Sequence, residues 1–518
     1  MSAPAPPAPP GEWQRLDPRM LLVHPVREVV RFLPPLVGLF LAGAASGGQP
    51  WQFLGIVVPV VLGLFRYLTT SFRIAAGRVE LKRGLLSRHV LSTPLDRVRT
   101  VDLTASPIHR VLGLTTLRIG TGTGASGDDD DLDLDGLPVA RAQELRADLL
   151  RTARAEVVAG PDGVPDDPDA PPAPERPVVE LDLAWLRYAP LTTSGLVVTA
   201  GILGLGGQVL GNVDLWDEVD PTSWHVGLPG WTAVLLGLVV LAVLVVAVSV
   251  VGYLVTNWGF ALTRSRGSWH LRRGLVTTRE TSLDEERVAG VTVGEPLGLR
   301  LAGGGRLTAI VTGLGSASGS STLVPPAPLA VVQRVGGAVL ASTAPVTVAL
   351  TGHGPAATRR RYTRAVGTAV VLAAAVASVP LLLGAPWWAV APVLVLPLAA
   401  LPLAADRARG LGHALSDGHV VARSGTLARR RDHLEVDHVI GWNLRATWFQ
   451  RRVGLTSLVA TTAGGPQSVT VLDVPEPLAV ALADATLPHV VRQFLAPASQ
   501  DPPPEGVGEG RGTARLPG

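Results

Sequence analysis

The sequence has no cysteine among its 518 residues, and Lys82 is its single lysine. Without cysteine the chain can form no disulfide, no thiolate nucleophile and no cysteine-ligated metal site. Charge is also scarce, because Asp, Glu, Lys and Arg make up 17% of the residues while hydrophobic residues make up 47%. This balance indicates that part of the chain is not solvated by water, as in a membrane protein.

Six apolar stretches come in three pairs, at about 30–46 with 51–67, 188–211 with 231–255, and 365–383 with 386–405. Each stretch approaches the roughly 20 residues that cross a bilayer as a helix. The connections within the pairs contain no Lys or Arg, whereas many arginines flank the other ends. The positive-inside rule therefore predicts that both termini and the three segments following the pairs are cytoplasmic.

The segments after the three pairs repeat one another. Residues 77–117 overlay residues 418–458 without a gap, and the middle copy is more diverged. Short alternating runs bounded by turn residues predict antiparallel strands in each copy. Each copy then ends in a strand, a proline and an amphipathic helix, at 139–156, 328–341 and 478–495. We expect a small barrel or sandwich that its C-terminal helix closes.

The predicted organisation places these parts in order along the chain. It comprises an N-terminal tail and juxtamembrane segment 1–28, transmembrane pair 29–68, β domain 69–157, Pro/Asp-rich linker 158–178, transmembrane pair 186–256, β domain 257–343, transmembrane pair 362–406, β domain 407–496 and disordered tail 497–518. The linker assignment follows from its many prolines and the lack of an apolar face to bury.

The repeated residues resemble the bacterial pleckstrin-homology (PH)-like domains of membrane proteins. The resemblance rests on 83–86 (RGLL), on 94–98 (PLDRV) and on 109–114 (HRVLGL), and the third copy repeats these features. The middle copy is shorter and Gly-rich in its later part. The resemblance implies a membrane α + β protein with six transmembrane helices and three PH-like antiparallel barrels. It further implies an anchored, non-catalytic protein of the bacterial plasma membrane.

Motifs for catalysis or metal binding fail on their context. Residues 122–127 fit G-x-G-x-x-G, but Asp128–Asp131 follow where a helix N-terminus should receive phosphate, so a hairpin loop is the preferred interpretation. Asp131, Asp133 and Asp135 imitate the start of an EF-hand loop, yet Ala142 replaces the chelating Glu. We therefore expect no enzyme activity, no cofactor and no metal site.

Basic side chains on the β domains are the remaining candidates for a binding site. Anionic lipid attracts such cations at a membrane surface. The candidates are Lys82, Arg83, Arg88, Arg97, Arg110, Arg429, Arg430, Arg431, Arg451 and Arg452. The alternative is that these residues are ordinary solvated strand faces or structural ion pairs.

Two classes of function remain. The first is a cytoplasmic binding or scaffolding platform for lipid head groups or for a membrane or cytoplasmic protein, such as a smaller PH-like membrane protein, with no nucleic acid as partner. The alternative is a transporter or permease-like component in envelope stress or antimicrobial resistance, regulated by the PH-like domains. Polar residues lining a path between the helix pairs would favour the alternative.

Overall fold

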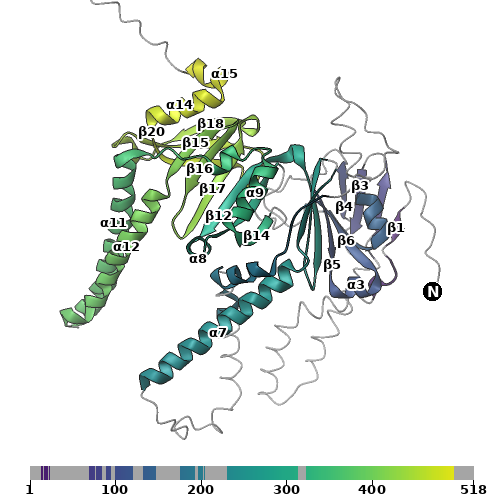
Figure 1. The fold of residues 1–518 in the computed structure, drawn as a ribbon, viewed down its shortest axis with the longest axis horizontal. Helices are drawn as coiled ribbons and strands as arrows, with labels where there is room; N and C mark the ends of the chain where they lie inside the picture. Colours follow the sequence, from purple (N-terminus) through teal and green to yellow (C-terminus); the bar gives the residue numbers. More distant parts are fainter. Residues whose placement is uncertain are drawn as a thin grey trace, which may run out of the picture.

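The computed structural model describes residues 13–15, 17–21, 23, 69, 71–75, 78–83, 89–94, 100–120, 132–146, 176–192, 197–201, 204, 230–265, 267–312, 322–384 and 386–494. The predicted spans 30–46 and 51–67, the C-terminal tail, most of the N-terminal tail and most of the Pro/Asp-rich linker lie outside these residues. Three β-rich units follow one another through the described part of the chain (Figure 1).

Each unit consists of two halves. The first half of the first unit contains β2 Ser71–Ala75, β3 Arg78–Arg83 and β4 His89–Pro94. The first half of the second unit contains β9 Ala261–Ser265, β10 Ser268–Arg273 and β11 Thr278–Asp284. The first half of the third unit contains β15 Gly412–Ser416, β16 His419–Ser424 and β17 Ala428–Glu435. The second half of the first unit contains β5 Thr100–Ala105, β6 Leu114–Gly120 and β7 Leu132–Pro138. The second half of the second unit contains β12 Val288–Pro296, β13 Gly304–Val311 and β14 Thr322–Pro328. The second half of the third unit contains β18 Gly441–Arg445, β19 Leu455–Thr461 and β20 Ser468–Pro475.

Two further strands extend the first halves at their outer edges. β1 Gln14–Arg15 pairs with β2, and β8 Arg176–Glu180 pairs with β9. The predicted linker thus ends earlier than residue 178, because its last residues form the start of β8. The expected N-terminal tail likewise contributes a strand to the first unit.

The sheets run across unit boundaries. One sheet has the order β7-β6-β5-β11-β10-β9-β8, and another has the order β14-β13-β12-β17-β16-β15. The second half of one unit therefore pairs with the first half of the next, at β5–β11 and at β12–β17; we call these two junctions seams. The sequence predicted three small barrels and left open whether they pack together; in the described residues the sheets extend from one unit into the next, because a strand edge that is unpaired within its unit finds a partner in the neighbouring unit.

The two seams have the same register. Ala105 faces Thr278 in the first seam, and Glu295, its equivalent in the second unit, faces Arg429 in the second seam. At the centre of each seam an aspartate faces a threonine, as Asp102 with Thr281 and as Asp432 with Thr292. The units are thus joined by one repeated mode of strand pairing.

A helix follows the last strand of each unit, as the sequence predicted. These helices are a segment starting at residue 139, α9 Leu329–Val339 and α14 Glu476–Thr486. Each begins directly after a proline, Pro138, Pro328 or Pro475, which cannot continue the strand ladder. Their apolar faces pack into the unit cores: Ala142 and Leu145 in the first unit, Val332 and Val335 in the second.

Three described helices are long and apolar enough to cross a membrane. They are α7 Gly230–Asn257, α11 Gly354–Leu382, and the segment formed by the 3-10 helix η6 Trp387–Leu394 and α12 Val395–Arg409. Most of their large apolar side chains are exposed. All three project from the β units toward one side of the molecule (Figure 1). Such apolar projecting helices indicate membrane association.

The helix bounds extend one predicted span and shorten another. α11 begins at Gly354 and contains the apolar stretch predicted from residue 365, because its first turns dock on the third unit. Residues 188–191 belong to the 3-10 helix η3 Leu183–Leu191. Tyr188 is 1% exposed and packs in the core of the second unit, so a span cannot begin there.

Candidate functional site

A short helix follows the first strand of each second half. These are α3 Pro107–Leu112, α8 Leu297–Leu301 and α13 Trp448–Arg451, and we call them together the helical rim. Ser106 and Thr447 cap α3 and α13, since their side chains accept hydrogen bonds from backbone N–H groups two to three residues into the helix. Capping by a hydroxyl residue thus fixes where the chain leaves the strand.

Each rim helix lies beside the end of an apolar helix. Arg110 Nη1 of α3 donates to the Leu275 carbonyl (2.6 Å), and the Leu275 N–H donates to Val255 in the last turns of α7. Arg300 of α8 pairs with Asp406 of α12 at 2.9 Å. Arg360 of α11 donates to Thr447 Oγ1, the cap of α13, at 3.4 Å. The rim therefore occupies the side of the β units from which the apolar helices leave.

Large apolar side chains are exposed on the rim. Val111 is 87% exposed, Leu301 79%, Phe449 66% and Trp448 52%. Sequence reasoning missed these four residues, although the gapless repeat places Phe449 opposite Ile108 between capping and basic residues. Apolar tips next to cations suit the boundary between headgroups and acyl chains.

Three predicted cations are on or beside the rim. Arg110, Arg451 and Arg452 are exposed, and the Arg452 guanidinium lies 4.1 Å from the centroid of the Trp448 ring. This stacking is a cation–π contact that holds the charge beside the exposed indole. The rim of the third unit therefore presents two aromatic rings and two guanidinium groups together.

Three other predicted cations already have partners within the protein: Arg429 and Arg431 are half-buried, and Arg430 is exposed but ion-paired. Arg429 pairs with Asp406 at 2.7 Å, and burial together with nearby Arg300 lowers its pKa. Arg431 donates to the carbonyls of Pro345 (3.1 Å) and Val348 (2.7 Å), and burial lowers its pKa. Arg430 pairs with Asp432 at 3.2 Å. These three arginines support the second seam and its surroundings.

The predicted cations of the first unit are only partly described. Lys82 is half-buried, with its Nζ 5.5 Å from the centroid of Trp13. Arg83 lies in β3, with its side chain outside the described part of the structure, and Arg88 and Arg97 lie outside the described residues altogether. Their predicted role stays a prediction.

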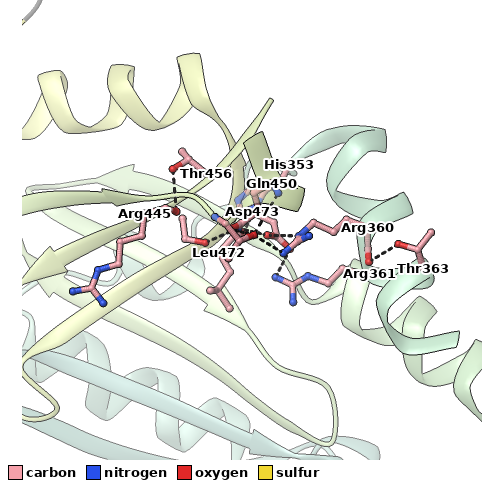
Figure 2. Close-up of polar contacts among 11 residues, drawn as sticks. His353, Arg360, Arg361, Thr363, Arg445, Gln450, Thr456, Leu472 and Asp473 are labelled. Carbon is pink, nitrogen blue, oxygen red and sulfur yellow. Dashed lines mark hydrogen bonds and ion pairs between the residues drawn. The ribbon is translucent and has the colours of Figure 1, made fainter. Parts of the chain in front are cut away.

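A buried polar cluster fixes α11 to the third unit (Figure 2). Asp473, 3% exposed, receives Arg360 Nε at 3.1 Å, Arg361 Nη2 at 2.7 Å and Gln450 Nε2 at 2.6 Å. Gln450 belongs to α13, so the cluster joins the apolar helix, the rim and β20. Removing any one partner would leave an uncompensated buried charge, which is strongly destabilising. The cluster is therefore a structural junction and not a reactive site.

Two histidines complete this junction. His353 Nε2 lies 3.0 Å from His413 Nδ1, and its own Nδ1 lies 2.8 Å from the Leu472 carbonyl. Burial, reinforced by His413, lowers the pKa of His353 to about 4, and burial lowers the pKa of His413. Both rings are therefore neutral near pH 7. No group of three His, Asp or Glu residues that could hold a metal occurs among the described residues.

Two regions of the chain match the family model of the Bacterial PH domain, at residues 28–153 and 366–486. These regions contain the first and third units, so the chain contains bacterial PH-like domain sequence at both places, and the resemblance is confirmed to that extent. The second unit lies outside the two matched regions but repeats the same strand order. No curated protein and no solved structure matches the chain.

Proposed function

We propose that the chain is a membrane-anchored, non-catalytic binding platform whose helical rim touches anionic lipid head groups. PH-like sequence at two regions supports a binding or scaffolding role. The observation that carries the lipid part is the third rim helix, where exposed Trp448 and Phe449 stand beside exposed Arg451 and Arg452. Aromatic and apolar tips enter the interface, and each nearby cation adds about 1 kcal/mol of attraction to anionic lipid.

Arginines at the unit ends of the apolar helices support a cytoplasmic location for the β units. Arg359, Arg360, Arg361 and Arg364 precede the apolar part of α11, and Arg407 and Arg409 end α12. Such clusters are retained on the cytoplasmic side of a membrane. The platform would then hang from the inner face of a bacterial plasma membrane, with the rim at headgroup level.

Among the predicted cations, Arg110, Arg451 and Arg452 are the ones we assign to lipid contact. Arg429 and Arg431 are instead assigned to structural roles, because their side chains are half-buried and their guanidinium groups bind Asp406 and backbone carbonyls. Arg110 also donates to a backbone carbonyl, of Leu275, but it remains exposed. Moving such a group to lipid would leave its present partners buried and unsatisfied. The permease alternative has no comparable support: α7 and residues 365–382 of α11 contain no charged side chain.

The absence of cysteine permits a site-specific test. Phe449→Cys in the full chain is labelled with an environment-sensitive fluorophore and reconstituted in phosphatidylcholine vesicles with or without phosphatidylglycerol. The matched control is Leu478→Cys, 40% exposed on α14, on the opposite side of the units from the apolar helices. We expect doxyl-labelled lipid to quench the label at 449 and to leave the label at 478 unquenched.

Charge reversal then separates anchoring from headgroup binding. Arg451→Glu with Arg452→Glu should remove about 2 kcal/mol of attraction, about 1 per cation, and reduce quenching at 449 in anionic vesicles only. Equal quenching at positions 449 and 478 would refute the proposed lipid contact. Unchanged quenching after charge reversal would refute the role of the two arginines.

A further inference from the structure

Two strands equivalent to those that pair across the seams have no seam partner among the described strands. β5 and β12 each pair with a strand of the next unit, but β18, their equivalent in the third unit, pairs among the described strands with β19 alone. β11 and β17 each pair with a strand of the preceding unit, whereas β4, their equivalent in the first unit, pairs among the described strands with β3 alone. Among the described strands, the row of units therefore has two complementary unpaired edges, one at β4 and one at β18.

The exposed edge of β18 carries residues that the seams bury. Leu103 of β5 and Val293 of β12 are 5% and 3% exposed, while Leu444, at the same position of β18, is 45% exposed. Burying a leucine of this kind on pairing is favourable by roughly 1–2 kcal/mol. Leu444 is therefore placed where a neighbouring strand would cover it.

A glycine at the edge also indicates a backbone neighbour. A Cβ on Gly290 of β12 would lie 2.0 Å from the His433 carbonyl oxygen across the second seam. Gly441 holds the same position in β18, where a Cβ would meet nothing within 4 Å. Glycine weakens a strand and marks close approach of another backbone, so its presence in an open edge fits a partner strand.

The rim restricts how that partner can be oriented. β18 runs toward α13, so its C-terminal end lies at the rim, as the ends of β5 and β12 do at α3 and α8. Antiparallel pairing of β18 with another β18 would turn the second copy's rim to the opposite side. Two copies anchored in one membrane cannot pair in this way. A strand of the β4 type runs in the required direction, as β11 and β17 show.

We propose that β18 of one copy pairs with β4 of a second copy, head to tail, in the register of the seams. The expected pairs are Arg445 with His89, Leu444 with Val90, Asn443 with Leu91, Trp442 with Ser92, and Gly441 with Thr93. Such a heterologous interface produces a ring if the rotation closes and a filament if it does not. This inference rests on membrane anchoring in the proposed function, but not on lipid contact by the rim.

The intermolecular seam is weaker than the internal ones. Each internal seam has an Asp–Thr pair at its centre, whereas Asn443 here faces Leu91, which offers no hydrogen bond. One lost hydrogen bond is worth about 1 kcal/mol, and the two copies are not tethered by a chain. The assembly is therefore reversible and depends on protein density in the membrane.

Cysteine pairs test the register in native membranes, since the chain has no cysteine of its own. A chain carrying Asn443→Cys and Leu91→Cys should form an oxidised ladder of dimers and larger oligomers. A control chain carrying Asn443→Cys and Val90→Cys should give about tenfold less product, because a slip of one residue moves the side chain to the other face. Equal product from the two chains, or monomer from both, overturns the proposal.

Chains with a single cysteine identify which strand pairs with β18. Copies with Asn443→Cys and copies with Leu91→Cys, expressed together, should give dimers only. Dimers from Asn443→Cys expressed alone would show β18–β18 pairing, and disulfides to a different protein would show another chain at this edge; either overturns a second copy's β4 as the occupant.

A charge placed on the edge gives an independent measurement. Adding Leu444→Asp to the chain carrying Asn443→Cys and Leu91→Cys should abolish the ladder, while Leu478→Asp, at a similarly exposed residue of α14, should leave it intact. Hydrogen exchange of β19 checks that the Leu444→Asp chain remains folded. A ladder that persists in a folded Leu444→Asp chain overturns the proposal. Failure of the lipid-quenching test at residue 449 would leave these results unaffected.

Discussion

β12 and β18 occupy the same place in consecutive units and differ in their surroundings. Seven residues of β12 have a partner in β17, and most of its side chains are buried. The residues of β18 are half-buried or exposed, although the aligned segments 290–294 of β12 and 441–445 of β18 both begin with glycine and continue with alternating apolar and polar residues. The burial of a strand in this protein is thus set by the neighbouring unit rather than by its own sequence.

The largest expected effect follows from replacing the glycine of the closed strand. Gly290→Ala places a methyl group against the His433 carbonyl, and the two strands must separate to accept it. We expect a loss of about 3 kcal/mol in the stability of the second seam, at the upper end of overpacking effects. Hydrogen exchange of the full chain in detergent should show faster exchange in β12 and β17.

The matched variant is Gly441→Ala, where a Cβ has open space. It should leave hydrogen exchange in β18 and β19 unchanged or slightly slower in the isolated protein, because alanine favours a strand over glycine. Equal losses in the two variants would contradict the difference between a closed and an open edge.

The sequence was sufficient to predict the elements within a unit. The helices after the last strands of the units follow from the helical periodicity of their residues, although β14 continues through Pro325, where the sequence had placed the end of the strand. Local signals of this kind depend only on neighbouring residues.

The seams could not be predicted in the same way. β5 and β11 are separated by the Pro/Asp-rich segment, β8 and α7, and an edge strand has the same alternating pattern whichever strand it pairs with. The candidate site was predicted in part for the same reason. Arg110, Arg451 and Arg452 are exposed as a binding site requires, but only the fold brings Arg429 to Asp406.

The polar pair at the centre of the second seam gives a smaller effect. Thr292 Oγ1 donates to Asp432 Oδ1 at 2.8 Å, and burial raises the pKa of Asp432 against the opposing influence of Arg430. Thr292→Val should cost about 1–2 kcal/mol, because it leaves a buried carboxylate with one partner fewer. Chemical denaturation followed by hydrogen exchange of β17 measures this loss.

A second variant tests whether the loss comes from the unsatisfied carboxylate. Thr292→Val combined with Asp432→Leu replaces both partners by apolar groups, which is close to neutral when the shapes fit. The double variant should therefore recover much of the stability. A loss equal to the sum of the two single variants would mean that the pair is not the source of the effect.

In the first seam the aspartate and the threonine have exchanged strands, with Asp102 in β5 and Thr281 in β11. This pair gives the smallest expected effect. Burial raises the pKa of Asp102 to about 6, although a hydrogen bond from Thr281 and the charge of Arg118 oppose the shift. The native state therefore holds the proton more tightly than the unfolded chain, whose aspartate has a pKa near 3.8. Stability contributed by this residue is present below pH 4 and is lost as pH rises through about 6.

Asp102→Asn removes this titration while keeping the shape of the side chain. At pH 7 the variant should be as stable as the parent or more stable, because the parent must hold a charge at this buried position while the asparagine is neutral. At pH 4 the gain should vanish, because the parent carboxyl is then protonated. Thermal unfolding of parent and variant at the two pH values measures this difference. If the variant instead loses stability relative to the parent on going from pH 4 to pH 7, the Asp102 charge supports the seam.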